Sequence, residues 1–246
     1  MDTNKFILIT GATSGIGEAA AIELSNTYNI VISGRNSEKL QQTLESCSKI
    51  NRVLIWVCDL EIERKEIQDS LNSFLTINNI AISAFIHCAG TTEILPFRHF
   101  PIEKIDSIFN VNLFSALEIL KVLLRKCNKG ELTQIIFISS LWTIRGNKGN
   151  SIYSAAKGAI NSLVYALAQE LAPKIRVNAL LLGAINTPML NERMQETSYK
   201  IKMQEEYPLG IGSVEDVITY IEFLLNPKTK WITGQNIILD GGRTTL

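Results

Sequence analysis

Residues 6–17 read Phe-Ile-Leu-Ile-Thr-Gly-Ala-Thr-Ser-Gly-Ile-Gly, a short apolar run followed at once by three closely spaced glycines. The run is typical of a buried strand, and a helix-like segment follows from about residue 16 to 27. Glycine removes the Cβ that would hold a phosphate away from backbone N–H groups, and a helix N-terminus adds partial positive charge. The segment therefore predicts a dinucleotide-binding turn. An ordinary glycine-rich turn is the alternative, because this glycine spacing is weak evidence by itself.

The same order of a short apolar run and a longer amphipathic segment repeats along the chain. It predicts further strands at residues 30–33, 53–57, 84–88, 135–138, 175–182 and 235–239, and helices at residues 37–50, 61–75, 101–127, 153–171 and 213–225. Runs that are apolar throughout indicate strands buried on both faces, as in a parallel sheet covered by helices. We therefore expect a single domain over residues 1–246, an α/β fold with a Rossmann-type doubly wound parallel sheet of about seven strands and helices on both faces.

The composition narrows the range of functions. The chain has 246 residues, with 24 Lys+Arg against 24 Asp+Glu, and this balance argues against a nucleic-acid partner. No apolar run approaches the ~18 residues of a membrane-spanning helix, and the first residues do not resemble a signal peptide. Dispersed cysteines and only two histidines favour a reducing compartment and no metal site. We expect a cytoplasmic protein without a membrane partner.

The end of the second predicted strand bears on the choice of cofactor. It reads Ser33-Gly34-Arg35-Asn36 and lacks the carboxylate that an NAD enzyme usually places there for the ribose 2′-hydroxyl. Arg35 could instead pair with a 2′-phosphate, aided by Ser33, Asn36 or Ser14. We therefore expect NADP as the cofactor. NAD is the alternative, with Arg35 as a solvated surface residue.

A serine, a tyrosine and a lysine form a candidate catalytic set. Ser140 follows the fifth predicted strand, and Tyr153-Ser-Ala-Ala-Lys157 opens the next helix, so Tyr153 and Lys157 project from one helix face. A neighbouring ammonium favours the phenolate form of a tyrosine, which suits a group that donates and takes back a proton. Each residue also has an ordinary structural role as its alternative. Their position downstream of the glycine turn favours the catalytic interpretation.

With these motifs together, residues 10–242 resemble the short-chain dehydrogenase/reductase family in its compact form. The resemblance implies an NAD(P)-dependent enzyme that transfers a hydride between the nicotinamide and a carbonyl carbon. It implies Tyr153 as general acid/base, Lys157 on the nicotinamide ribose and Ser140 as a donor to the substrate oxygen. Asn112, in the segment Asn110-Val-Asn112, would hold a water that links Lys157 to solvent.

The resemblance also implies which residues surround the cofactor. Residues 183–187 would contact the nicotinamide, and Asp59 and Leu60 would lie beside the adenine, with a helix N-cap role as the alternative for Asp59. The full expected set is Gly11, Thr13, Ser14, Gly15, Ile16, Gly17, Arg35, Asp59, Leu60, Ala89, Gly90, Tyr153, Lys157, Gly183, Ile185 and Thr187.

Two departures from the family pattern bear on substrate identity. His87-Cys88-Ala89-Gly90 stands where Asn-Asn-Ala-Gly is usual, and Leu182-Gly183 stands where Pro-Gly is usual. Neither change removes a proton carrier. We expect His87 to be structural, the cysteines to be small core residues, and Leu182 to loosen the turn under the nicotinamide.

The motifs are most similar to those of 3-oxoacyl-[acyl-carrier-protein] reductases. This implies a small carbonyl or alcohol substrate, a carrier-bound 3-oxoacyl thioester among the candidates. The alternatives are a dehydrogenase or reductase of a sugar, a steroid or a secondary metabolite, and a non-catalytic nucleotide-binding regulator. Four basic residues are candidates for meeting an acidic carrier near the site, or are ordinary solvated side chains: Arg125, Lys126, Lys129 and Lys174.

Two further expectations concern a lid and the assembly. Residues 186–212 are long and polar and would follow a strand's carboxyl end, which favours a mobile substrate lid. Members of the family pair their long helices, here near residues 101–127 and 151–172, and their C-terminal strands. The resemblance therefore implies a homotetramer or a homodimer.

Overall fold

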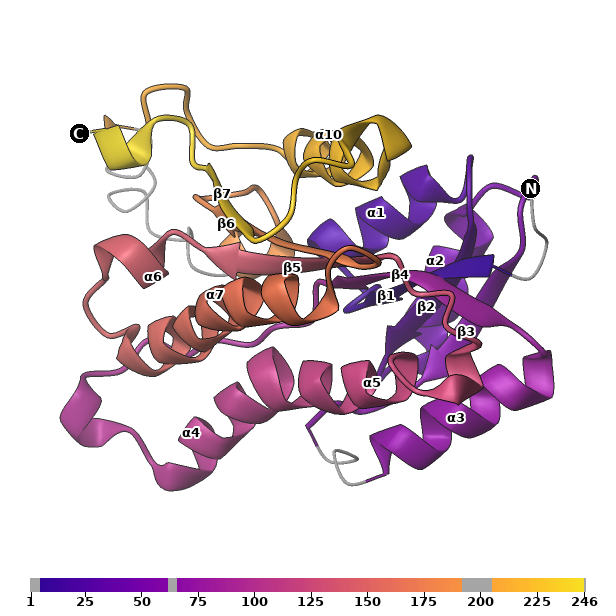
Figure 1. Cartoon of the computed structure of the whole chain (residues 1–246). Helices are drawn as coiled ribbons and strands as arrows, with labels where there is room; N and C mark the ends of the chain where they lie inside the picture. Colours follow the sequence, from indigo (N-terminus) through magenta and orange to yellow (C-terminus); the bar gives the residue numbers. More distant parts are fainter. Residues whose placement is uncertain (1–4, 62–65, 192–204, 246) are drawn as a thin grey trace.

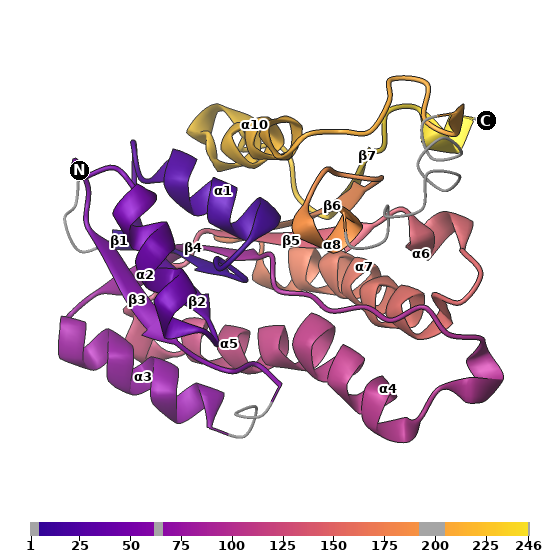
Figure 2. The same cartoon turned by 180° about the vertical axis from the view of Figure 1, so that it is seen from behind.

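The computed structural model describes residues 5–61, 66–191 and 205–245. They form one seven-stranded parallel sheet in the order β3-β2-β1-β4-β5-β6-β7 (Figures 1 and 2). Its strands are β1 (Lys5–Thr10), β2 (Asn29–Gly34), β3 (Val53–Val57), β4 (Ala81–His87), β5 (Gln134–Ser140), β6 (Arg176–Leu182) and β7 (Gln235–Leu239). The strand order reverses between β1 and β4, the place where doubly wound sheets bind ligands. The predicted fold class is confirmed.

Helices cover both faces of this sheet (Figure 1). One face carries α1 (Gly15–Leu24), α2 (Ser37–Ser46) and α10 (Val214–Leu225), and the other carries α3 (Ile67–Asn78), α4 (Ile102–Phe109), α5 (Ser115–Leu123) and α7 (Ser151–Leu171). Two short helices, α6 (Trp142–Arg145) and α8 (Pro188–Asn191), follow β5 and β6. No helix in the described ranges is long and apolar enough to cross a membrane.

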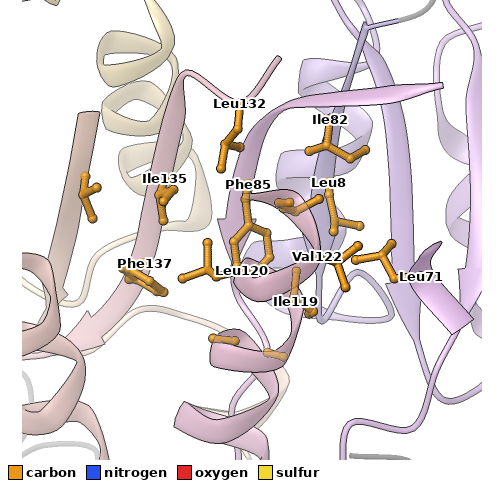
Figure 3. Close-up of a cluster of buried hydrophobic side chains, with 14 of the residues drawn as sticks. Leu8, Leu71, Ile82, Phe85, Ile119, Leu120, Val122, Leu132, Ile135 and Phe137 are labelled. Carbon is orange, nitrogen blue, oxygen red and sulfur yellow. The ribbon is translucent and has the colours of Figure 1, made fainter. Parts of the chain in front are cut away.

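The strands are apolar throughout because successive side chains enter two different cores. Leu8 of β1 packs with the core under α3, α5 and α7, whereas Ile9 enters the core under α1 and α10. In the first core, Phe85 and Phe137 from neighbouring strands meet edge to face with ring centroids 6.5 Å apart, and Leu120 of α5 lies beside them (Figure 3). Burial of each such side chain stabilises the folded state by roughly 2 kcal/mol.

The helix predicted over residues 101–127 is interrupted where it passes the sheet's carboxyl edge. A π turn at Asn110–Phe114 separates α4 from α5, and the Ser115 N–H donates to the Asn110 carbonyl. The Asn112 amide stabilises this turn by donating to the carbonyls of Thr91 (2.7 Å) and Ile108 (2.8 Å). A π turn holds one residue more than an α-helical turn, and this rotates the Asn112 side chain inward. Asn112 is fully buried.

Other boundaries differ for local reasons. The helix predicted at 61–75 begins at Ile67 and ends at Asn78, because Asn79 takes up the left-handed conformation that stops a helix. Its predicted residues 62–65 lie outside the described residues. The fifth strand extends to Ser140, and the short helix α6 was not predicted because four residues carry no periodic pattern.

Candidate active site

A cavity of about 420 Å³ lies beyond the carboxyl ends of the strands, where the strand order reverses. Segments that follow β1, β2, β3, β4, β5 and β6 build its walls. Every residue of the expected cofactor-binding set lines this cavity, and so does Ser140. Asn112 is fully buried and is not part of the lining.

The glycine turn closes tightly before α1. Gly11 and Gly15 have φ of 70° and 57°, which favours glycine. A Cβ on Gly17 would lie 2.3 Å from the Gly11 oxygen, so the turn accepts no side chain there. Ser14 precedes α1 and its side chain makes no capping hydrogen bond. The first N–H groups of α1 are therefore available to a diphosphate, and this part of the cavity fits a dinucleotide.

The end of β2 presents one cation to the same cavity. Arg35 is exposed and lines it. Ser33 is fully buried outside the lining, and the Asn36 oxygen caps α2 by accepting from the Lys39 N–H (2.9 Å). The expectation that Ser33 assists Arg35 is therefore wrong, because β2 packs its side chain into the sheet. The cap engages only the Asn36 oxygen, so a bond from the Asn36 amide nitrogen to a 2′-phosphate stays a prediction. Ser14, the third residue considered, lines the cavity as Arg35 does.

Asp59 lies in a turn after β3. Its carboxylate accepts from the Glu61 N–H (3.0 Å), whereas α3 begins eight positions later at Ile67 with Glu66 as its N-cap. The alternative role of Asp59 as the N-cap of this helix is therefore wrong. Asp59 and Leu60 both line the cavity.

Lys157 is buried at the opposite end of the cavity from Arg35. Its side chain projects from α7 with Tyr153, which is half-buried and lines the cavity. The ammonium donates to the Ile138 carbonyl (2.8 Å). Burial lowers the pKa of Lys157 to about 8, and Cys88 opposes this effect. A lysine in this state can release and regain a proton near neutral pH.

Asn112 and Lys157 meet behind Gly90. A Cβ on Gly90 would lie 2.9 Å from the Asn112 oxygen and 3.4 Å from the Lys157 nitrogen, so both polar atoms reach the same small space. The Asn112 Oδ1 atom is buried and has no hydrogen-bond partner in the described part of the chain. The π turn, the end of β4 and α7 thus bring two separated residues together.

Ser140 is held by a hydrogen-bond network that the sequence did not reveal. Its Oγ accepts from the Trp142 N–H (3.3 Å), which leaves the hydroxyl proton for another acceptor. Thr143 donates to the Ser140 carbonyl, and Asn161 donates to Thr143, both at 2.7 Å. The Asn161 oxygen accepts from Ser139 at 2.7 Å. Asn161 stands four positions after Lys157 on one helix face, a spacing that was available as a signal.

Residues 5–198 match the family model described as short chain dehydrogenase. The chain belongs to the short-chain dehydrogenase/reductase family. It is 31% identical to a tropinone reductase homologue of Arabidopsis thaliana over 96% of this chain and 92% of that protein. It is also 31% identical to a 3-oxoacyl-[acyl-carrier-protein] reductase of Aquifex aeolicus over 97% and 96%. The solved structure of 4-hydroxyisoleucine dehydrogenase complexed with NADH is similar, with a TM-score of 0.90, 25% identity, and 99% and 100% of the two chains covered.

The membership makes this chain an NAD(P)-dependent oxidoreductase. Its departure from the family pattern at His87 is accommodated without an exposed charge. The ring is fully buried beside Phe85 and Phe137, and its Nδ1 lies 2.9 Å from the Thr10 hydroxyl. Burial, and then the Lys157 cation, lower the pKa of His87 to about 3. The neighbouring Cys88 has its pKa raised to about 12 by burial.

The loop expected to contact the nicotinamide is braced by Tyr207, a residue that sequence reasoning missed. Tyr207 is buried and lines the cavity, and its oxygen accepts from the Ala184 N–H (3.0 Å). Burial raises the pKa of the Tyr207 phenol. Behind it, the Arg243 guanidinium lies 5.9 Å from the ring centroid and pairs with Glu206 (2.8 Å).

The Leu182 departure does not leave this loop unsupported. The Leu182 carbonyl accepts from the Leu141 N–H (2.9 Å), and the Gly183 N–H donates to the Leu239 carbonyl (2.8 Å). A Cβ on Gly183 would lie 2.8 Å from Tyr207. The expected loosening is therefore wrong, because β5, β7 and Tyr207 hold the turn from three sides.

The four basic residues considered for carrier contact lie at the other edge of the sheet. Arg125, Lys126 and Lys129 follow α5 ahead of β5, and Lys129 donates to Asn79 (3.0 Å), just before β4. Lys174 stands just before β6. All therefore lie at amino-terminal strand ends, whereas the cavity lies at carboxyl ends. Within one chain, the expectation that they lie near the site is wrong.

Proposed function

We propose that this protein uses NADPH to reduce a carbonyl to an alcohol, with Tyr153 as the general acid/base. The observation that carries the proposal is the convergence of four side chains at one end of the cavity. Ser140, Tyr153 and the buried Lys157 line it, and Asn112 faces Lys157 behind Gly90. This set can supply, stabilise and return one proton.

The chain's own residues define the proton chemistry. When bound, the reduced nicotinamide supplies the hydride that reaches the carbonyl carbon. Tyr153 gives its phenolic proton to the carbonyl oxygen, and Ser140 donates a hydrogen bond to the same oxygen. The Lys157 ammonium then stabilises the phenolate. Asn112 Oδ1 accepts a hydrogen bond from a water beside Lys157, and this water carries the replacement proton inward.

The preference for NADPH rests on Arg35. The β2 end offers a guanidinium and no carboxylate, and a guanidinium pairs with a phosphate through two parallel hydrogen bonds. Ser14 supplies a hydroxyl on the facing turn. Thermal unfolding with each nucleotide tests this choice, and NADP should raise the melting temperature more than NAD. Equal or greater stabilisation by NAD would overturn the assignment.

The substrate is a small carbonyl compound, and a 3-oxoacyl thioester is one candidate. The similarity to a tropinone reductase homologue supports the alternative, reduction of a secondary metabolite. Residues 186–212 serve as the lid over it. Its described residues are 186–191, which include α8, and 205–212, which end in the bridge between Ile185 and Gly212. Residues 192–204 lie outside the described residues. We place the enzyme in the cytoplasm.

A homotetramer or homodimer accompanies this function. β7 is an edge strand of the described sheet with Ile238 partly exposed, and Trp231, just before it, is 97% exposed. Phe223 of α10 adds another exposed apolar side chain. Light scattering on the purified protein measures the assembly, and a monomer would contradict it.

Oxidation of NADPH against a ketone panel that includes an acetoacetyl thioester tests the activity. Tyr153→Phe should lower kcat by roughly 100-fold or more while nucleotide binding remains, since general acid catalysis contributes about that factor. Tyr165→Phe is the matched control, because Tyr165 lies on the same helix and is 57% exposed. If no ketone is reduced while nucleotide binds, or if Tyr153→Phe is as active as wild type, the proposal fails. The nucleotide-binding regulator is then favoured.

A further inference from the structure

The reacting end of the cavity has a wall of apolar side chains. Beyond Ser140 and Tyr153, the lining includes Trp142 on α6, Met189 and Leu190 on α8, and Tyr207. Thr91 and Thr92, which follow β4, add two hydroxyl groups to it. Asn147 adds one exposed amide at the rim. This composition differs from the nucleotide end, where Arg35 and backbone N–H groups are presented.

Trp142 is the best-placed member of this wall. It stands two residues after Ser140, and its backbone N–H donates to the Ser140 hydroxyl oxygen (3.3 Å). The half-buried indole packs into a small cluster built on Leu141, Ala184 and Tyr207. The hydrogen bond holds the Trp142 backbone beside Ser140, and packing holds the indole. A flat apolar surface thus stands beside the group expected to hold the reacting oxygen.

None of the charged side chains in the described lining is available to a substrate beside Trp142. They are Arg35, Asp59, Glu61 and Lys157. The first three follow β2 and β3 at the nucleotide end, and the Lys157 ammonium donates to the Ile138 carbonyl. An ionic group on a substrate beside Trp142 would therefore lose water without gaining an opposite charge from these residues. Desolvation of an unpaired ion is strongly unfavourable.

We propose that the substrate is an uncharged cyclic ketone whose ring lies against the Trp142 indole, with Asn147 bonding a polar substituent at the rim. This inference rests on the proposed carbonyl reduction and names its substrate class. An aromatic face favours a flat ring or its C–H edge over a strongly hydrated chain. By the charges of the described lining, open-chain thioesters rank second, and keto acids, sugar acids and phosphorylated sugars rank last.

A matched pair of ketones that differ by one charge tests the proposal. Methyl 4-oxocyclohexanecarboxylate and its free carboxylate share the reacting carbonyl and the ring, and only the second is an anion at pH 7. We expect kcat/KM for the ester to exceed that for the carboxylate by about tenfold or more, since 1.4 kcal/mol corresponds to tenfold. The ester should also exceed an acetoacetyl thioester. Calorimetric titration of each compound into the NADP complex measures binding without turnover.

Variants then locate the ring. Trp142→Ala should lower kcat/KM for the ester by about tenfold and leave acetone, which is too small to cover the indole, within about twofold. Trp142→Phe keeps an aromatic face and should lie between, which separates loss of the ring contact from misfolding. Ile77→Ala is the control, because Ile77 of α3 is 81% exposed and does not line the cavity.

The outcomes separate the two proposals. If ketones are reduced but ester and carboxylate react and bind equally, or Trp142→Ala affects acetone as much as the ester, the cyclic-ketone inference is overturned and carbonyl reduction stands. If the ester binds in a Trp142-dependent way and no ketone is reduced, carbonyl reduction fails and the ring site stands. If no ketone binds or reacts, both fail.

Discussion

Replacing Lys157 with Met should change how the stability of the protein depends on pH. Burial lowers the pKa of this ammonium from its ordinary 10.5 to about 8. The unfolded chain therefore binds more protons than the folded chain between pH 8 and 10.5. The free energy of unfolding therefore rises as the pH increases from 8 to 10.5. This gain in stability is lost again as the pH falls back through the window to the folded-state pKa.

The size of the effect follows from the same two values. One pKa unit corresponds to about 1.4 kcal/mol, so the buried ammonium costs the fold on the order of 3 kcal/mol at pH 7. Raising the pH from 7 to 9.5 should recover about 2 kcal/mol, because the lysine of the unfolded chain is still mostly charged there. Lys157→Met removes the charge and the donor to Ile138 together. At neutral pH it should therefore be at least as stable as the wild type, although it is expected to be inactive.

Urea unfolding of both proteins without nucleotide, at pH 7 and at pH 9.5, measures this difference. Cys88, whose pKa burial raises to about 12, and the other titrating groups are present in both proteins, so the difference between the two pH responses isolates Lys157. A reducing agent keeps the four cysteines as thiols. If the two proteins respond to pH in parallel, Lys157 is not held as a costly cation and the reasoning on its proton release is refuted.

Three further changes probe the glycine turn, the nicotinamide loop and the departure at His87. Gly17→Ala should abolish nucleotide-dependent thermal stabilisation, because its Cβ would lie 2.3 Å from the Gly11 oxygen. Gly158→Ala on α7 is the control: a Cβ there would have no neighbouring atom within 4 Å, and the change should stabilise the fold by about 0.5–1 kcal/mol. Tyr207→Phe should strand the Ala184 N–H and raise the KM for NADPH several-fold with a smaller change in kcat; an unchanged KM would contradict the bracing role. Burial lowers the pKa of His87 from 6.5 to about 3, so the folded protein holds this imidazole neutral. The stability gained by burying the neutral ring is fully present above pH 6.5 and is lost as the pH falls toward 3. Between pH 7.5 and 4.5 the wild type should therefore lose about 3 kcal/mol more than His87→Asn, measured by urea unfolding, and equal losses would contradict this.

Features of this protein that depend on neighbouring residues could be predicted from the sequence. The strand over Val53–Val57 and the strand over Gln235–Leu239 have the predicted bounds, because an apolar run between polar turns is a local signal. The glycine turn is likewise a local signal, because glycine adopts the positive φ of Gly11 without strain. The positions of Tyr153 and Lys157 on one face follow from helical spacing alone.

Features that depend on distant contacts could not be predicted in this way. The π turn at Asn110–Phe114 is stabilised by a bond from Asn112 to Thr91, 21 positions earlier. Tyr207 reaches Ala184 across 23 positions, and no periodic pattern links them. The position of Lys129 and Lys174 could have been predicted from the sequence, because residues just before parallel strands lie at the edge of the sheet opposite the carboxyl ends.

The polar groups behind the cavity are costly to the fold, and their position argues for a proton-handling role. Lys157 is a buried cation, and an apolar residue of similar size would cost less. Asn112 places in the interior an oxygen that has no partner among the described residues, and its π turn replaces regular helical hydrogen bonds. Both polar groups lie behind Gly90, where a Cβ would be 2.9 Å from the Asn112 oxygen and 3.4 Å from the Lys157 nitrogen. A structural role could be met more cheaply by apolar packing at each position. Apolar packing cannot replace a group that must release and regain a proton in the interior. The convergence of these residues therefore supports catalysis over nucleotide sensing.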